Sequence, residues 1–246
     1  MHGVVIIGKP IYVCENHEKA FYYWCKAKKN MCIGDAFFLV TLDAHLDLMG
    51  WGLQSDFRKE INRLGLGDLD RMKELATRPR AGRQDIITYR QSLAAMEAGL
   101  VGDVLLISPQ IPFFEIYEDL SKRKHRIFHC VHPSRLRDLL TKNKALRKSI
   151  GYDGRADSNL ILDIDLDFFT HLDKHEIPHV ITEEELREIF SGDSILWWIY
   201  EKAKSITISL EPFWCGGMDN SERILKLLKT YFQECETASK NQIPES

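Results

Sequence analysis

Several features that mark other protein classes are scarce or missing in this sequence of 246 residues. The six cysteines are scattered and form no Cys-x-x-Cys pair, which argues against a structural zinc site. Lys and Arg number 33 against 36 Asp and Glu, so the net charge of −3 supplies no basic surface for nucleic acid. No apolar run approaches the roughly 18 residues that suggest a membrane span. We therefore expect neither a nucleic-acid nor a membrane partner.

The N-terminal region also lacks the charged segment followed by an apolar segment that secretory signals have. With unpaired cysteines, this leads us to expect a reduced protein in the cytoplasm. Hydrophobic residues make up 44% of the chain, which is enough for a sizeable core. Because we find no repeat and no linker, we expect one domain over residues 1–236 and a polar, frayed tail over residues 237–246.

Short apolar runs rich in Val, Ile, Leu and Phe have the composition of strands covered on both faces. The six runs are Val4–Ile7, Ala36–Leu42, Val104–Ser108, Arg126–Val131, Asn159–Leu166 and Ser205–Leu210. Such runs are typical of a parallel sheet.

Helical patterns lie between these runs. Gly99 is a plausible C-terminal cap, Pro133 a plausible helix start, and Thr182 with Glu185 has the form of a capping box. The expected helices cover Glu18–Lys28, Ile87–Ala98, a segment from Pro133 through Leu140, a segment after Thr182, Ser194–Lys204 and Ser221–Glu234. Strands that alternate with helices predict an α/β layered domain.

The stretch Gly50–Gln84 combines five glycines with many charges and is expected to be the least ordered part of the chain. It follows directly on a predicted strand, where α/β proteins build their sites. We expect it to shape a substrate mouth.

The first cluster of chemically active residues is Asp43-Ala44-His45-Leu46-Asp47, directly after an apolar strand. Residues two apart on a strand share a side, so Asp43 and His45 converge, and a turn after His45 brings Asp47 to the same point. Buried charges are costly unless they are paired or bound to a cation. The alternative is that Asp43 caps a following helix and His45 is solvated.

The second cluster places Asp163, Asp165 and Asp167 at alternate positions of an apolar run. Three carboxylates on one side repel one another strongly unless protons or cations intervene. An exposed edge strand with a solvated acidic face is the alternative, but the preceding Leu-Ile-Leu is typical of a central strand.

Together the two clusters indicate a metal centre. Carboxylates with some imidazole suit Mn²⁺, Mg²⁺, Fe²⁺ or Zn²⁺, and two metals that share a bridging Asp need about six ligand groups. The two clusters supply five, and His17 in Glu15-Asn16-His17-Glu18 is the candidate for the sixth. A histidine at a helix start can also be a surface residue.

These residues carry a resemblance to a known family. Asp-Ala-His-x-Asp at 43–47, followed by Asp-Ile-Asp at 163–165, resembles the metal-binding signature of the arginase and agmatinase superfamily. The set that adds Glu-Asn-His at 15–17, Leu-Asp-Ile-Asp-Leu-Asp-Phe-Phe at 162–169 and Thr-Ile-Ser-Leu-Glu-Pro-Phe-Trp-Cys-Gly-Gly at 207–217 is similar to a branch that includes the peptide arginases. Those enzymes convert arginine side chains of ribosomally made peptides to ornithine.

The resemblance implies a three-layer α/β/α arginase-like fold with a mostly parallel central sheet and two divalent ions, expected to be Mn²⁺. It implies metal ligation by His17, Asp43, His45, Asp47 and Asp165, with Asp165 bridging or nearly bridging the two ions, and by either Asp163 or Asp167 according to the register chosen. It also implies that Glu211 binds the guanidinium group, although a Glu at a strand end can be a surface residue.

The sequence departs from the ureohydrolase pattern at two places. The Gly-Gly-Asp-His form around the first histidine is absent, and no Asp-Pro follows the Asp-x-Asp pair. The proton-shuttling histidine has no clear counterpart, so Asp47 or a nearby histidine is left for that role. The candidates are His125, His129, His132 and His171.

The expected function is a manganese-dependent hydrolase that converts arginine in a peptide substrate to ornithine and releases urea. A deacetylase-like amide hydrolase would use the same metals without guanidinium recognition. A phosphohydrolase with Asp163 as nucleophile and Asp165 as acid would leave Asp43 and His45 unexplained. A metal-stabilised interaction module would bind metal without turnover.

Overall fold

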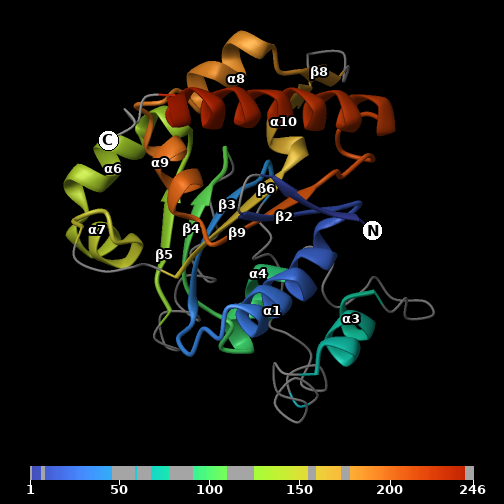
Figure 1. Ribbon diagram of the computed structural model, residues 1–246, viewed down its shortest axis with the longest axis vertical. Helices are drawn as coiled ribbons and strands as arrows, with labels where there is room; N and C mark the ends of the chain where they lie inside the picture. Colours follow the sequence, from blue (N-terminus) through green and yellow to red (C-terminus); the bar gives the residue numbers. More distant parts are fainter. Residues whose placement is uncertain are drawn as a thin grey trace.

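The computed structural model describes residues 2–6, 9–45, 59, 68–77, 91–109, 125–154, 159–172 and 178–241. Within these residues the chain is an α/β protein whose mostly parallel sheet is flanked by helices, as predicted (Figure 1).

The main sheet has seven strands in the described part of the chain, in the order β1-β2-β9-β6-β3-β4-β5. They are β1 (His2–Ile6), β2 (Lys9–Cys14), β3 (Phe37–Leu42), β4 (Val101–Ile107), β5 (Ile127–Cys130), β6 (Leu160–Asp165) and β9 (Ser205–Ser209). Neighbouring strands are parallel except for β1 and β2, which pair antiparallel at one edge. A separate antiparallel pair joins β7 (Thr170–Leu172) and β8 (Pro178–Val180).

The described α-helices are α1 (Ala20–Asn30), α3 (Leu69–Thr77), α4 (Gln91–Glu97), α6 (Leu136–Lys142), α7 (Lys144–Ile150), α8 (Glu183–Ile189), α9 (Ile195–Lys202) and α10 (Met218–Asn241). Short 3-10 helices are η1 (His17–Lys19), η2 (Pro133–Arg135) and η3 (Leu166–Phe169). Among the described residues, no helix combines the length and apolar character needed to cross a lipid bilayer.

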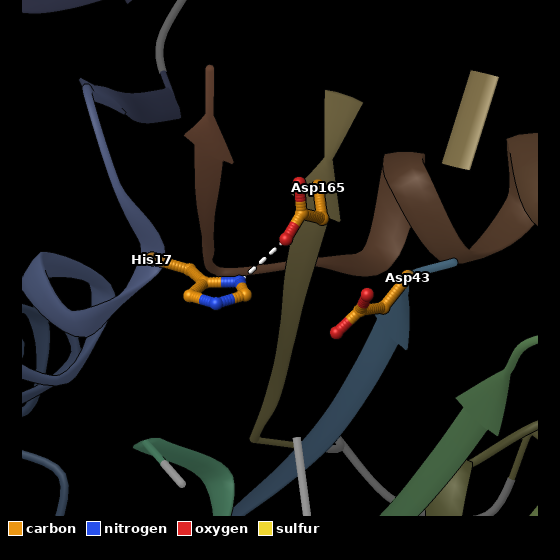
Figure 2. A group of neighbouring side chains, drawn as sticks. All are labelled: His17, Asp43 and Asp165. Carbon is orange, nitrogen blue, oxygen red and sulfur yellow. Dashed lines mark hydrogen bonds and ion pairs between the residues drawn. The ribbon is translucent and has the colours of Figure 1, made fainter. Parts of the chain in front are cut away.

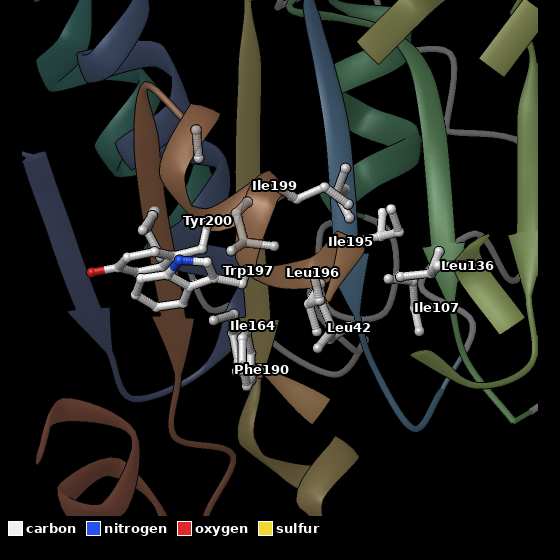
Figure 3. Close-up of a cluster of buried hydrophobic side chains, with 14 of the residues drawn as sticks. Leu42, Ile107, Leu136, Ile164, Phe190, Ile195, Leu196, Trp197, Ile199 and Tyr200 are labelled. Atoms are coloured by element: carbon white, nitrogen blue, oxygen red, sulfur yellow. The ribbon is translucent and has the colours of Figure 1, made fainter. Parts of the chain in front are cut away.

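Side chains at alternate positions of the central strands pack into two different cores. On β3, Val40 and Leu42 belong to a core shared with α6 to α10, whereas Leu39 belongs to a core shared with α1, α3 and α4. Figure 3 shows Leu42 in the first core, together with Ile164 of β6 and the apolar residues of α9. Burial on both faces explains why these strands read as continuous apolar runs.

Helix ends follow the predicted signals where the structure describes them. Thr182 and Glu185 form the predicted capping box at the start of α8. Gly99 has a φ of 66°, in the left-handed region that glycine tolerates, two residues after α4 ends. Pro133 opens η2, which leads directly into α6.

The N-terminal strands differ from the prediction. The run Val4–Ile7 corresponds to β1, which lies at the antiparallel edge, and the parallel strand next to β9 is β2, which no apolar run predicts. Lys9 and Pro10 interrupt its apolar pattern. The proline is opposite Val5 and precedes the pairing with β9, which begins at Ile11, so its missing N–H removes no bond of the parallel ladder.

Two segments are more regular than their composition predicts. Residues 69–77 within the stretch 50–84 form α3, because this segment contains no glycine, is rich in residues of high helix propensity, and buries Met72 in the core shared with α1 and α4. Apart from residues 59 and 68, the remainder of that stretch lies outside the described residues. Helix α10 continues to Asn241, so the first residues of the predicted tail, 237–241, are helical rather than frayed.

The strand order places a topological switch point between β3 and β6. From β3 the chain continues to β4 and β5 on one side, and from β6 it continues to β9 on the other side. Open α/β sheets bind ligands at the carboxyl ends of strands at such a point. The first Asp-rich cluster follows β3, and the second lies at the carboxyl end of β6.

Candidate metal centre

The candidate ligands come together at the carboxyl ends of β2, β3 and β6. His17 opens η1 after β2, Asp43 is the residue after β3, and Asp165 is the last residue of β6. Figure 2 shows these three side chains converging from three separate segments. All three are buried, with at most 2% of their surface exposed.

Among the described residues, two groups have the geometry to hold a metal ion, and they share Asp43. One consists of His17, Asp43 and Asp165, and the other of Asp43, His45 and Asp167. In each group the potential ligand atoms lie within 4.8 Å of one another. Ligand atoms on one ion at about 2.1 Å lie at most about 4.2 Å apart, so small side-chain adjustments suffice.

In the first group, His17 Nδ1 lies 2.5 Å from Asp165 Oδ2. Burial raises the pKa of Asp165 well above its usual value, and the nearby charge of Asp167 raises this pKa further. His17 opposes the shift because it is close enough to interact with the carboxylate. Asp165 therefore stands in a site that favours either a proton or an added cation.

The second group is built by a turn after β6. Asp167 lies in η3, where its Oδ1 accepts a hydrogen bond from the Ala44 amide at 3.2 Å and its Oδ2 lies 2.7 Å from His45 Nδ1. The His45 amide donates to Asp43 Oδ1 at 2.6 Å. These contacts fix the backbone after β3 against the turn after β6.

The three aspartates of the second cluster do not all lie on one strand. Strand β6 ends at Asp165 rather than Leu166, so Asp167 reaches the site through the 3-10 turn and not by alternation along the strand. Asp163 lies outside both groups. It accepts a hydrogen bond from the Thr207 hydroxyl of β9, and that hydroxyl accepts one from the Trp24 indole at 3.0 Å.

The buried negative charge of the site favours a proton or a cation. Asp165 and Asp167 are 1% and 2% exposed, and their hydrogen-bond and ion-pair partners within the described residues are the two imidazoles and backbone amides. No described Lys or Arg pairs with either of them. Because buried carboxylates are costly without compensating positive charge, a divalent ion in each group would meet this need.

Several predicted residues are not brought into the two groups. Asp47 lies outside the described residues. The ring of His125 donates to the Gly102 carbonyl, the ring of His129 to the Ser108 carbonyl, and His132 accepts from the Ser134 amide. His171 stacks on His179 in the β7–β8 pair.

Glu211 lies beside the first group, at the end of β9. Its Oε1 accepts a hydrogen bond from the His17 amide at 2.7 Å, and only 7% of the residue is exposed. Its negative charge contributes to the raised pKa of Asp165, which places it within electrostatic range of the candidate metal ligands. Its φ of 42° lies in the left-handed region, which costs energy for a residue with a side chain.

Two side-chain contacts around the site were not predicted from the sequence. The Trp214 ring centroid lies 4.5 Å from that of His45. The Thr207 hydroxyl accepts a hydrogen bond from the Trp24 indole and donates one to Asp163. Trp214 stands in the segment that carries the resemblance, but nothing in its spacing from residue 45 predicts the contact. Nothing in the sequence distinguishes Thr207 from other strand residues or Trp24 from other helix residues.

We expect His17→Ala to weaken the binding of one metal ion more than the other. His17 belongs to one group only, whereas Asp43 serves both. Loss of one imidazole ligand should reduce affinity at the first group by roughly a hundredfold or more and leave the second group occupied. Titration with Mn²⁺ followed by calorimetry would show two resolved steps. An unchanged titration would return His17 to the role of an ordinary buried histidine.

Comparison with known proteins gives no assignment, since neither the models of known families nor the curated proteins contain a match to this chain.

Proposed function

We propose that the chain is a binuclear metal-dependent hydrolase that converts arginine side chains of a peptide substrate to ornithine with release of urea. The observation that carries this proposal is the sharing of Asp43 between two His/Asp groups at the switch point of the sheet, in which only His45 is partly exposed. A shared carboxylate is the arrangement by which two ions are held about 3.5–4 Å apart in hydrolytic sites.

The donor set fits hard or borderline divalent ions. His17 and His45 offer one imidazole to each group, and the remaining donors are carboxylate oxygens. Such a set suits Mn²⁺ or Mg²⁺, and no described cysteine belongs to either group. When bound, two such ions lower the pKa of a water molecule so that hydroxide is available near neutral pH.

The residues of this chain would then serve two purposes. The ions would be held by the members of the two groups, which are His17, Asp43, His45, Asp165 and Asp167. Glu211 adds a buried carboxylate beside the first group, where it can accept hydrogen bonds from a guanidinium. In the overall reaction the guanidinium carbon gains the oxygen of water, its bond to the side-chain nitrogen breaks, and that nitrogen leaves as the amine of ornithine after taking up a proton.

The phosphohydrolase alternative has less support. A nucleophilic aspartate must be accessible to the substrate phosphorus. Asp163 is only 1% exposed, accepts a hydrogen bond from the Thr207 hydroxyl, and belongs to neither group. An amide hydrolase remains compatible with the same metal centre, and it differs in having no use for a guanidinium-binding carboxylate.

The protein treated with EDTA and then loaded with Mn²⁺ is expected to contain about two ions per chain and to melt at a higher temperature than the metal-free form. At 100 times the Kd, each ion stabilises the folded state by about 2.7 kcal/mol, which corresponds to a rise in Tm of several degrees, roughly 5–10 °C. The loaded protein should release urea from an arginyl peptide. Release of acetate from an acetyl-lysine peptide, without urea, would support the amide hydrolase instead.

A further inference from the structure

The loop after β9 carries an exposed aromatic pair. Phe213 is 82% exposed and Trp214 is 36% exposed, and their rings meet edge to face at 5.0 Å. Large apolar side chains exposed to this extent next to one another are unusual on a protein surface unless they contact a ligand or partner.

This pair is continuous with the candidate metal centre. The Trp214 ring lies 4.5 Å from the His45 ring, and His45 is a member of the second group. Glu211, two residues before Phe213, lies beside the first group. A molecule that approaches the metal groups along this side therefore contacts Phe213 first and then Trp214.

The loop is held in place at both ends. The Glu211 amide donates to the Glu15 carbonyl at 3.0 Å, and the Glu211 carbonyl accepts from the Trp214 and Cys215 amides. Gly216 has a φ of 77°, and a Cβ there would lie 2.4 Å from Pro178 Cγ, so glycine allows this close approach to β8. The aromatic pair is thus presented by a fixed turn rather than by a free end.

The difference in burial between the carboxylates and Phe213 limits which ligands can contact both. The carboxylates of Asp43, Asp165 and Asp167 are at most 2% exposed, whereas Phe213 stands largely in solvent. A ligand that spans this depth must place its guanidinium at Glu211, beside the metal groups, and extend outward past Trp214. A free amino acid ends near the site, while a polypeptide continues over the aromatic pair.

We propose that Phe213 and Trp214 bind the residues that flank the reacting arginine of a polypeptide substrate, and this rests on the proposed function. The apolar rings cover the backbone and an apolar side chain next to the arginine, and Glu211 receives the positive charge of its guanidinium. Binding energy gained away from the reacting group selects peptides over free arginine.

The test compares Phe213→Ala with the parent protein, each loaded with Mn²⁺, on acetyl-Leu-Arg-Leu-amide and on free L-arginine. Phe213→Ala should lower the ratio of peptide kcat/KM to arginine kcat/KM about tenfold, the size expected for losing one partly buried aromatic contact. A binding readout independent of turnover is the Kd of a fluorescein-labelled form of the same peptide for metal-free protein, measured by anisotropy. This Kd should rise by a similar factor.

Tyr152→Ala is the matched control. Tyr152 is 37% exposed and meets Trp198 edge to face at 5.0 Å, so it reproduces the chemistry of the pair away from the candidate metal centre. Its peptide Kd and its kinetic ratio should equal those of the parent.

The inference is overturned if the parent does not bind the peptide, if Phe213→Ala keeps the parental Kd and ratio, or if Tyr152→Ala changes them equally. The proposed function fails separately, if the parent releases urea from neither substrate. Peptide binding that depends on Phe213 without urea release would support the aromatic contact and refute guanidinium hydrolysis.

Discussion

Asp43→Asn is expected to remove both metal ions, because Asp43 is the one described residue that belongs to both candidate groups. Asparagine keeps the shape and one oxygen but loses the charge that two ions share. Metal content should fall from about two ions per chain to near zero, and activity should fall roughly a thousandfold or more, as expected when several kcal/mol of metal assistance are lost. Elemental analysis after gel filtration, together with the urea assay, measures both.

The matched control is Asp163→Asn. Asp163 is equally buried and lies on the same strand as Asp165, but it is outside both groups and accepts a hydrogen bond from Thr207. This variant should keep both ions and the metal-dependent rise in Tm. If Asp43→Asn retains two tightly bound ions, the shared-carboxylate arrangement is wrong, and if Asp163→Asn loses them, the second cluster binds metal in its other register.

Glu211→Gln is expected to separate metal binding from catalysis. The Glu211 side chain accepts a hydrogen bond from the His17 amide, which the glutamine oxygen can also accept, so the backbone before η1 should keep its position. The negative charge that would bind a guanidinium is lost. Since charge-assisted hydrogen bonds contribute about 1.5–3 kcal/mol each, kcat/KM on an arginyl peptide should fall about a hundredfold with both ions retained.

Glu18→Gln provides the comparison for this result. Glu18 is another mostly buried carboxylate close to His17, 9% exposed and bound by the Asn16 side chain at 3.1 Å, but it is in neither metal group. Its replacement should change kcat/KM less than about threefold, within the range of substitutions away from special features. A Glu211→Gln protein with parental activity would make Glu211 a bystander, and one without metal would make it a ligand.

The mostly parallel character of the sheet was predictable because its central strands are buried on both faces, and such strands have uninterrupted apolar sequences. The order of the strands was not predicted. The end of β3 was predictable for the same reason, and with it the position of Asp43 directly after the strand, whereas the end of β6 was predicted one residue too late. The strand β2 was not predictable, since Lys9 and Pro10 break its pattern and its parallel pairing begins only at Ile11.

The register of the acidic cluster could not be read from alternation. Spacing alone treats Asp163, Asp165 and Asp167 as equivalent, whereas the chain leaves β6 after Asp165 and turns through η3. Where a strand ends depends on the tertiary packing around it, here the pairing of β6 with β3 and β9. The contact between Trp214 and His45 likewise depends on a loop conformation that includes left-handed backbone at Glu211.

The position of β2 beside β9 has a consequence for the order of folding. Ile11 pairs with Ile206, so a chain that is synthesised from its N-terminus makes its first parallel strand long before the neighbour on which that strand docks. The β1–β2 hairpin closes locally, but the pairing of β2 with β9 joins residues that are far apart in the sequence. Pairings that close such long loops form slowly. Since His17 follows β2, its meeting with Asp165 completes only after this docking. If His17 binds a metal ion as proposed, occupancy of that site would report a late step of folding, whereas Asp43 and Asp165 follow or end strands that are neighbours in the centre of the sheet.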